Sequence, residues 1–225
     1  MVRLENIHKT YDTGGSRVLA LRDVSLQLEP GEFASVMGPS GCGKSTLLHL
    51  LAGLDQPDSG GVFINGNNLA RMDDNALTRL RRDQIGFVFQ FFNLLPTLTV
   101  LENVMLPLML QGGPPAENRE KSALWLDRVG LSHRLAHRTH QLSGGEMQRA
   151  AIARALVHNP VLILADEPTG NLDSETGGQI MNLLQSISRD SRTTMLLVTH
   201  SDQVAAFSHR LIRLADGRLL SDDKK

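Results

Sequence analysis

Apolar and polar residues alternate over residues 2–7 and again over residues 18–28. This alternation is typical of strands that bury one face and expose the other. Later segments are apolar almost without interruption, at residues 33–37, 85–89, 161–165 and 193–198. Unbroken apolar strands are typical of a parallel sheet that is covered on both faces. The pattern therefore predicts an α/β fold, with half-buried strands near the N-terminus and a parallel sheet beyond them.

Helical patterns and helix breakers lie between these strands. Asp73 or Asp74 can cap a helix that runs through Arg82, and residues 99–110 and 117–129 favour two further helices. A Gly-Gly-Pro-Pro breaker separates these two helices, and a glycine stops the second. The middle of the chain is therefore expected to be helical.

The absence of a strand pattern from residues 91–157 divides the chain. This segment is expected to form a helical subdomain that is inserted into a sheet domain. Residues 1–90 and 158–225 then form the core around the parallel sheet, and the 225 residues make a single domain.

The chain is expected to end in a hairpin and a short tail. Asp216 and Gly217 are a typical two-residue hairpin turn between apolar stretches. Residues 221–225 are expected to form a short polar tail after the hairpin.

Composition and charge exclude several classes of protein. The net charge of −1 provides no general attraction for nucleic acid, and the basic cluster Arg79, Arg81 and Arg82 is interpreted as a solvated helix face. The single cysteine, Cys42, excludes an intramolecular disulfide and favours a reducing compartment. No apolar stretch is long enough to span a bilayer. We therefore expect a cytosolic protein, or one that docks peripherally at a membrane.

The stretch with the most specific chemistry is a glycine-rich turn after the strand at residues 33–37. It contains a complete G-x-x-x-x-G-K-S phosphate-binding pattern, formed by Gly38, Pro39, Ser40, Gly41, Cys42, Gly43, Lys44 and Ser45. Glycines let the backbone wrap an anion, and N–H groups at a helix N-terminus converge on it. Lys44 adds positive charge between the β- and γ-phosphates, and the Ser45 hydroxyl is placed to hold Mg²⁺. The Cys42 thiol, beside Lys44 and a helix N-terminus, is expected to react with alkylating reagents.

A second turn also opens a helix. Ser143 can cap the Ala-rich helix that follows, with Glu146 completing a capping box. The Ser143 hydroxyl and the N–H groups of Gly144 and Gly145 also form a site for a charged oxygen. By itself this motif fits an anion site and a well-capped helix alike.

Polar residues follow the ends of the apolar strands. Asp166 and Glu167 end one strand, and Gln90 and His200 follow two others. Ligands of open α/β sheets gather at the carboxyl ends of the strands. Asp166 is expected to orient the Mg²⁺ shell, and Glu167 to polarise the attacking water as the catalytic base.

In their order along the chain, these motifs resemble the complete set of an ABC-type ATPase subunit. The resemblance covers nearly the whole chain. It implies a P-loop NTPase with a RecA-like core, an N-terminal antiparallel β subdomain and an inserted α-helical subdomain that carries the signature turn. It also implies ATP and Mg²⁺ as ligands, and a homodimer in which Ser143 to Gly145 of one copy close over the γ-phosphate held by Lys44 of the other.

The resemblance extends the set of site residues. It implies that Tyr11 stacks on adenine, that Gln90 senses Mg²⁺ and water, that Asp173 lies in the cross-dimer loop and that His200 contacts the γ-phosphate. The expected catalytic residues are Glu167, His200 and Lys44, and the expected metal ligands are Ser45, Gln90 and Asp166. The expected nucleotide contacts are Tyr11, Gly38, Pro39, Ser40, Gly41, Cys42, Gly43, Lys44, Ser45, Thr46, Gln90, Ser143, Gly144, Gly145 and Asp173.

Finer features are similar to one branch of this family, which serves lipoprotein release, macrolide export and antimicrobial-peptide resistance. They are the segments 94–104 and 166–174. The branch implies an integral membrane permease as partner, with the subunit at the cytoplasmic face of the plasma membrane. Phe91, Phe92 and Leu94 are expected to form an exposed apolar patch that contacts the permease.

Three alternatives remain open. A non-transporting regulator of the cell envelope or division machinery would contain similar motifs. A soluble ABC ATPase that acts on DNA or ribosomes usually has coiled coils, zinc modules or a second ATPase half, which this chain lacks. A P-loop kinase would have no reason to contain the turn at residues 142–148. No nucleic-acid partner is expected.

Overall fold

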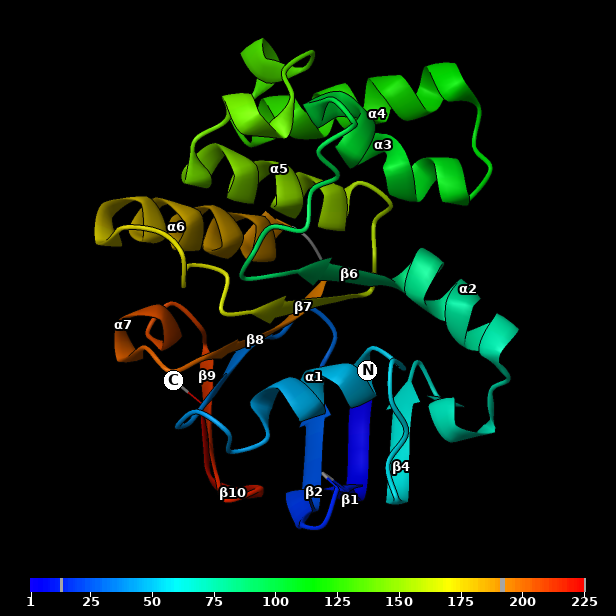
Figure 1. The fold of residues 1–225 in the computed structure, drawn as a ribbon, viewed down its shortest axis with the longest axis vertical. Helices are drawn as coiled ribbons and strands as arrows, with labels where there is room; N and C mark the ends of the chain where they lie inside the picture. Colours follow the sequence, from blue (N-terminus) through cyan, green and yellow to red (C-terminus); the bar gives the residue numbers. More distant parts are fainter. Residues whose placement is uncertain (13, 191–192, 225) are drawn as a thin grey trace.

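The computed structural model describes residues 1–12, 14–190 and 193–224. In this part of the chain the strands form two sheets, and α-helices lie on both faces of the larger sheet (Figure 1). None of the described helices is long and apolar enough to cross a membrane. The predicted α/β fold with a helical insertion is confirmed.

The larger sheet has six strands in the order β10-β9-β3-β8-β7-β6. Its strands are β3 (Phe33–Met37), β6 (Ile85–Val88), β7 (Leu162–Asp166), β8 (Thr194–Thr199), β9 (Arg210–Ala215) and β10 (Arg218–Lys224). All neighbours pair in parallel except β9 and β10. The unbroken apolar strands of the sequence therefore lie in a parallel sheet, as predicted.

The smaller sheet has four strands in the antiparallel order β2-β1-β4-β5. Its strands are β1 (Val2–Asp12), β2 (Arg17–Leu28), β4 (Ser59–Ile64) and β5 (Asn67–Asn68). The alternation in the sequence corresponds to alternating burial along β1 and β2. This sheet packs over α1 on the side away from the larger sheet (Figure 1).

The helices fall into two groups. The ones packed on the sheets are α1 (Lys44–Leu51), α2 (Asp74–Gln84), α6 (Ser174–Asp190) and α7 (Asp202–Ala205). The helical subdomain, residues 91–157, contains α3 (Val100–Leu110), α4 (Pro115–Arg128) and α5 (Gly144–Leu156), and it has short 3-10 turns at Ser132–Arg134 and Thr139–Gln141. Asp73 caps α2, which ends two residues later than predicted, at Gln84. Thr99 caps α3 with a capping box.

Strand register decides which polar residues meet. Met37 pairs with Thr199, and Asp166 pairs with Val198, so β3, β7 and β8 end at one edge of the sheet. The segments that follow these strands contain the phosphate loop, Glu167 and His200. Motifs more than 100 residues apart in sequence are therefore neighbours at this edge.

The apolar core has three parts. One surrounds α1 between the two sheets, and another lies between the larger sheet and the helices α5 and α6. The third lies within the helical subdomain. Helix α5 belongs to two of them, because Ile152 and Leu156 pack toward the sheet while Ala150 and Ala153 pack toward α3 and α4. The helical subdomain is thus attached to the sheet mainly through α5.

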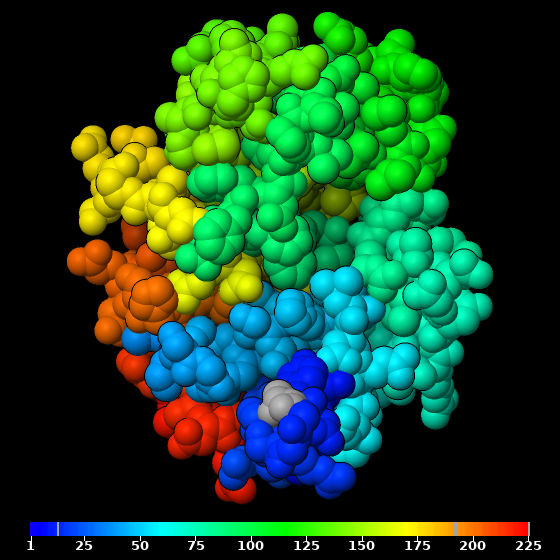
Figure 2. Space-filling model, viewed as in Figure 1, coloured from blue at the N-terminus to red at the C-terminus, as the bar shows by residue number. Residues whose placement is uncertain are grey.

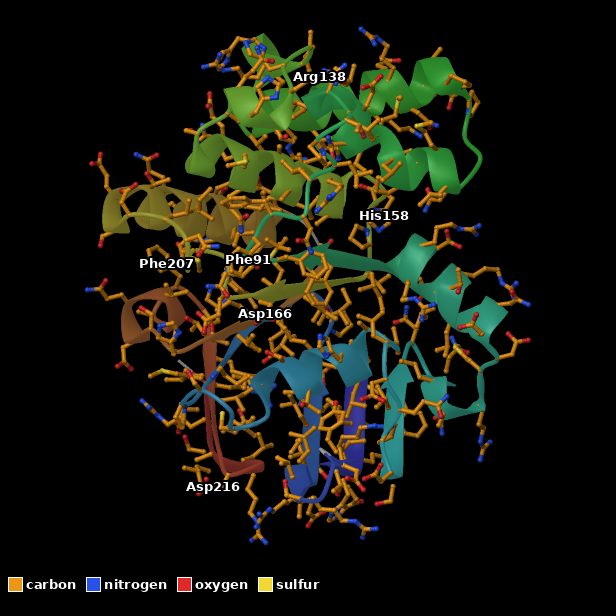
Figure 3. All side chains as sticks on the ribbon, in the orientation of Figure 1. Phe91, Arg138, His158, Asp166, Phe207 and Asp216 are labelled. Carbon is orange, nitrogen blue, oxygen red and sulfur yellow. The ribbon has the colours of Figure 1, made fainter. Side chains whose placement is uncertain are left out.

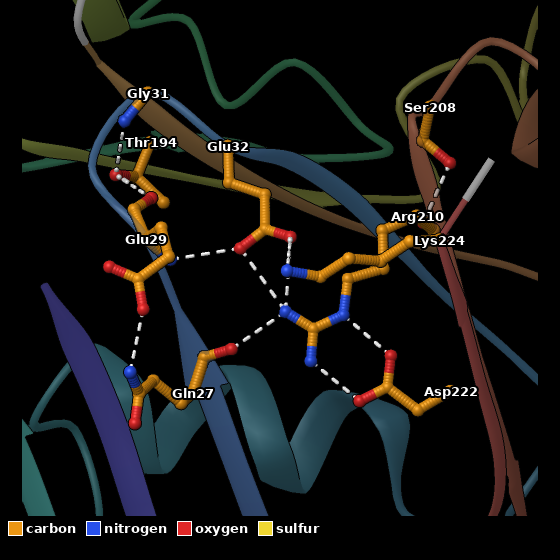
Figure 4. A network of polar contacts seen from close by, with 9 residues as sticks. All are labelled: Gln27, Glu29, Gly31, Glu32, Thr194, Ser208, Arg210, Asp222 and Lys224. Carbon is orange, nitrogen blue, oxygen red and sulfur yellow. Dashed lines mark hydrogen bonds and ion pairs between the residues drawn. The ribbon is translucent and has the colours of Figure 1, made fainter.

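The polar tail predicted at residues 221–225 is wrong for the described residues. Residues 221–224 belong to β10, while Lys225 lies outside the described residues. Arg210, which is 7% exposed, donates to both carboxylate oxygens of Asp222 at 2.5 Å and contacts Glu32 at 3.1 Å (Figure 4). Its guanidinium also donates to the Gln27 carbonyl of β2 at 2.7 Å. A buried charge needs such partners. The contact of Arg210 with Asp222 therefore holds the polar residues 221–224 in strand β10.

Candidate functional site

The phosphate loop joins β3 to the N-terminus of α1. Pro39, Ser40 and Gly41 are its exposed tip, whereas Gly43 and Lys44 are buried. Lys44 Nζ donates to the carbonyls of Gly38 and Pro39, at 2.7 and 2.9 Å. Among the described residues, no side chain caps α1 and no acidic residue lies in its first turn. The N–H groups and positive end of this helix are therefore left for an anion.

Two glycines of the loop are required by close backbone contacts. A Cβ atom on Gly38 would lie 2.0 Å from the Leu214 carbonyl oxygen of β9. A Cβ on Gly43 would lie 2.4 Å from the Ala20 carbonyl oxygen of β2, and Gly43 also has a φ of +107°. The loop is thus held between strands of both sheets, and these backbone contacts fix its shape.

A hydroxyl and a carboxylate meet beside the loop. Ser45 Oγ lies 3.5 Å from Asp166 Oδ2, and Ser45 is exposed at the start of α1. Burial, and then the nearby charge of Glu167, raise the pKa of Asp166. A desolvated carboxylate next to a hydroxyl is the hard-oxygen donor set that Mg²⁺ prefers. These residues fit the metal that the sequence predicts.

Glu167 lies directly after β7, in a left-handed backbone conformation with a φ of 44°. Its carboxylate accepts from the Thr199 hydroxyl at 3.1 Å and lies 2.7 Å from His200 Nδ1. The side chain of His200 is 65% exposed and that of Glu167 is 16% exposed. Two contacts from the end of β8 therefore orient a carboxylate at the sheet edge, as a general base requires.

Gln90 lies beside the segment that follows Glu167. Asn171 Nδ2 donates to the Gln90 carbonyl at 2.9 Å, and a Cβ on Gly170 would lie 2.7 Å from Gln90 Nε2. Asp173 directly precedes α6, and its carboxylate accepts from the Thr176 N–H at 2.9 Å and the Thr176 hydroxyl at 2.7 Å. Asp173 is thus engaged within its own chain, and its cross-dimer role stays a prediction.

Tyr11 lies on β1, next to the loop between α1 and β4. Its hydroxyl donates to Asp55 Oδ2 at 2.7 Å, and Lys9 Nζ donates to the other oxygen of Asp55 at the same distance. Burial, and then the contact with Asp55, raise the pKa of Tyr11. These contacts fix the ring orientation. Thr46 is half-buried in the first turn of α1, near the Tyr11 hydroxyl.

The second turn has the capping box that the sequence predicts. Ser143 Oγ accepts from the Glu146 N–H at 3.3 Å, and Glu146 Oε2 accepts from the Ser143 N–H at 2.8 Å. Arg134 donates to the other oxygen of Glu146 at 2.8 Å. Helix α5 lies on the opposite face of the larger sheet from α1 (Figure 1). The turn formed by Ser143, Gly144 and Gly145 is therefore not brought to the phosphate loop of the same chain.

Two predicted exposures need correction. Phe91 is 71% exposed, but Phe92 and Leu94 are only partly exposed, and Leu94 packs against the core of the helical subdomain. The predicted apolar patch is therefore reduced to Phe91, together with Leu95, which is 43% exposed. Cys42 is only 5% exposed, so ready alkylation of its thiol is not expected in this state.

Sequence reasoning missed a groove between the core and the helical subdomain. Its volume is about 390 Å³, and it lies between α2 and β6 on one side and α3 and α5 on the other. Figure 2 shows the hollow where the green helical subdomain meets α2 in cyan-green, and Figure 3 places His158 there. The lining includes Phe87, Phe89, Leu106, Arg81, Arg82 and Arg154, and no described lining residue is acidic. Arg81 and Arg82, from the α2 cluster that was interpreted as a solvated face, thus border the groove.

Two polar residues of α5, the buried Gln148 and the half-buried Arg154, were also missed. Gln148 Nε2 donates to the Pro168 carbonyl at 2.6 Å, and Arg154 donates to the carbonyls of Phe92 and Asn93 at 2.7 and 2.5 Å. A signal for both exists in the sequence, since each is a long polar residue in an Ala-rich helix that packs on two faces. Their partners cannot be inferred from the sequence.

Comparisons with known proteins agree with this geometry. The sequence profile described as ABC transporter matches residues 21–170. The uncharacterized ABC transporter ATP-binding protein MJ0796 of Methanocaldococcus jannaschii is 50% identical over 228 residues, which cover 100% of this chain and 97% of that protein. The lipoprotein-releasing system ATP-binding protein LolD of Pseudomonas syringae is 47% identical, over 96% of this chain and 95% of LolD.

A longer relative and a solved structure add to these. The macrolide export ATP-binding/permease protein MacB of Chlorobium luteolum is 46% identical, and the match covers 100% of this chain and 34% of MacB. The dimeric post-hydrolysis structure of the ATP-binding cassette MJ0796, bound to ADP and Pi, superposes with a TM-score of 0.91 at 46% identity. It covers 100% of this chain and 98% of that chain, which confirms the predicted fold class.

Proposed function

Because the chain belongs to the ABC transporter family as an ATP-binding ATPase subunit, we propose that two copies enclose two MgATP molecules and drive a separate membrane permease. One observation carries the two-copy arrangement. Helix α1, which follows the phosphate loop, and helix α5, which follows the Ser143 turn, lie on opposite faces of the larger sheet of one chain. A second copy is needed to bring the two turns to one nucleotide, and the MJ0796 cassette has dimeric structures.

Binding begins at the phosphate loop. Lys44 now donates to two loop carbonyls, and a phosphate oxygen is a stronger acceptor for its ammonium group. The triphosphate is held by the free N–H groups at the N-terminus of α1 and by Lys44, which exchanges its loop carbonyls for phosphate oxygens. Tyr11 stacks on the base. Ser45, Gln90 and Asp166 would hold Mg²⁺, which supplies positive charge against the phosphate oxygens.

Glu167 is the general base in this proposal. Its carboxylate accepts a proton from the attacking water, whose oxygen bonds to the γ-phosphorus as the bond to the β,γ-bridging oxygen breaks, giving ADP and phosphate. Thr199 and His200 keep the carboxylate aimed at the sheet edge. Asp173 and the turn of the partner copy complete the enclosure. Loss of the bridging γ-phosphate contacts then lets the two copies separate.

The groove between core and helical subdomain is the docking site that we propose for the permease. It is apolar along Phe87, Phe89 and Leu106 and has arginines of α2 and α5 on its two sides. Exposed apolar surface beside arginines whose charge is not balanced by an acidic lining residue fits a partner segment that has an apolar face and an acidic residue. Docking there places the subunit at the cytoplasmic face of the plasma membrane, as a peripheral protein.

The relatives favour the branch of lipoprotein release and macrolide export, because LolD and MacB match nearly all of this chain. We therefore propose an export or lipoprotein-release complex, or one that transmits mechanical signals. A regulator of the cell envelope or division machinery is the competing function. The membrane protein that co-purifies with the subunit separates the two.

Replacing the base tests the ATPase mechanism. Glu167→Gln should slow ATP turnover by roughly 10²-fold or more, because amide oxygens do not accept the proton of water. ATP binding and ATP-dependent dimerisation should remain, as measured by phosphate release and by sedimentation. Glu120→Gln, on an exposed position of α4, is the matched control. Turnover within threefold of the parent would remove Glu167 from this role.

The same trapped variant tests docking. Membranes incubated with the Glu167→Gln protein and MgATP should yield a permease that co-purifies with it. Leu110→Ser should reduce this capture, because Leu110 lines the groove and is 63% exposed. Leu124→Ser is the matched control, because Leu124 is 59% exposed and lies outside the groove lining. Equal capture by both variants would contradict the proposed docking site.

A further inference from the structure

Helix α5 is bonded to the segment that follows the proposed base. Gln148 is fully buried, and its Nε2 donates to the Pro168 carbonyl at 2.6 Å, one residue after Glu167. Its Oε1 is buried and has no hydrogen-bond partner among the described residues. A buried, half-satisfied amide costs stability, so a packing role alone would favour an apolar residue here.

Arg154 bonds the same helix to the segment that follows Gln90. Its guanidinium donates to the carbonyls of Phe92 and Asn93, which have φ angles of 62° and 51°. Burial lowers the pKa of Arg154, and no described carboxylate forms an ion pair with it. The Arg154 guanidinium therefore bonds two carbonyls instead of a carboxylate. These carbonyls belong to a turn in the left-handed conformation, which non-glycine residues rarely adopt.

We propose that Gln148 and Arg154 are positioning residues through which α5 couples the two ATP sites of the dimer. Both contacts lie in the chain's own site, after Glu167 and after Gln90. The turn at the N-terminus of the same helix faces the ATP of the other copy. The inference rests on the proposed function, because it needs the two-copy arrangement.

The packing of α5 makes such coupling mechanical. The helix packs on the sheet core on one side and on α3 and α4 on the other, so a shift of α5 relative to the sheet is passed to the helical subdomain. Gln148 and Arg154 are about 9 Å apart along its axis, so together they set its position and tilt. A shift of either segment at one site therefore moves Ser143 and Gly144 at the other.

Two measurements separate coupling between the sites from a role within one site. They are the strength of ATP-driven dimerisation and the ATP affinity of the monomer. In the Glu167→Gln background, Arg154→Met should weaken ATP-driven dimerisation by roughly tenfold. ATP affinity, measured with a fluorescent ATP analogue below the dimerisation concentration, should stay within twofold of the parent. Gln148→Met should weaken dimerisation in the same way but less. Arg154→Lys should restore most of it, because an ammonium group still reaches one carbonyl.

Arg119→Met is the matched control, since Arg119 is exposed on α4. Dimerisation of Arg154→Met within twofold of the parent would overturn the inference. A loss of monomer ATP affinity equal to the loss of dimerisation would also overturn the inference, because Arg154 would then act only on the ATP bound by its own chain. If Arg154→Met does not fold, the Arg154→Lys and Gln148→Met variants decide the same question. A parent that never dimerises with ATP would instead refute the proposed function, and the coupling would fall with it.

Discussion

The two glycine-rich turns of this chain both open a helix, but their surroundings differ. At α1, no described side chain caps the helix, and Lys44 donates only to carbonyls of its own loop. At α5, Ser143 and Glu146 cap each other, and Arg134 pairs with Glu146. The first turn is therefore incomplete without an anion, whereas the second is stable as it stands. This contrast suits one turn to binding and the other to closing over a bound ligand.

The glycines of the phosphate loop and of the α5 turn also differ in how closely their neighbours pack. Added Cβ atoms at Gly38 and Gly43 would meet backbone carbonyl oxygens of neighbouring strands. Added Cβ atoms at Gly144 and Gly145 would meet the side-chain ends of Leu172 and Thr176. Strand backbone in a core cannot yield, whereas a side-chain end can rotate. The phosphate loop is thus built into the core, and the α5 turn lies at a more adaptable junction.

The largest expected difference between the turns is in ATP turnover. Lys44→Ala should abolish ATP binding by the monomer and lower turnover by roughly 10³-fold, because a positioned cation is lost. Ser143→Ala should leave monomer binding unchanged and lower turnover by roughly 10-fold, through a lost hydrogen bond to a charged oxygen. A fluorescent ATP analogue and phosphate release measure both effects. Weakened monomer binding in Ser143→Ala would break the comparison.

The next largest difference is in stability. Gly43→Ala should lower the free energy of unfolding by roughly 3 kcal/mol, because the new Cβ meets a strand carbonyl and φ is +107°. Gly144→Ala should change it by less than about 1 kcal/mol, because Leu172 can move and alanine favours helices. Urea denaturation without nucleotide measures both. Equal losses in the two variants would show that the turns are equally rigid.

The smallest difference is in the pH dependence of stability. The pKa of Asp166 is raised by burial, so ionising it opposes folding at neutral pH, and this penalty disappears as pH falls below about 4. The pKa of Glu146 is lowered, mainly by the Ser143 N–H, so its ionisation supports folding and the support is lost as pH falls through its folded pKa.

Because the two pKa shifts have opposite signs, removing each charge should change Tm in opposite directions. Asp166→Asn should raise Tm at pH 7 by about 1 to 3 °C, a small gain because partial exposure screens the charge. Glu146→Ala should lower Tm by a similar amount. Both differences should shrink toward pH 4 in nucleotide-free thermal scans. Shifts of the same sign at pH 7 would contradict the contrast between the two turns.

Much of the fold follows from local pattern. Alternation identified β1 and β2, and the unbroken apolar segments identified β3, β6, β7 and β8. The capping box at Ser143 and the turn at Asp216 were likewise evident, because each depends on a few adjacent residues. Asp216 lies in the structure at the opposite end of the molecule from Arg138 of the helical subdomain (Figure 3).

Errors arose where long-range partners outweigh local character. The polar segment at residues 221–224 forms a strand because buried Arg210 binds Asp222. Leu94 is covered by the helical subdomain, and Cys42, within the phosphate loop, is buried in the core around α1. These contacts depend on how the segments pack rather than on the character of adjacent residues, so no local pattern indicated them.

The amino-acid sequence alone determined the chemistry at each point, because the phosphate loop, the capped turn and the acids after β7 depend on neighbouring residues. Only the tertiary structure decided how these points are related. Strand register aligns the ends of β3, β7 and β8, and the larger sheet separates α1 from α5. The bonds of Gln148 and Arg154 to distant carbonyls likewise exist only in the folded chain, because packing rather than sequence proximity brings those partners together.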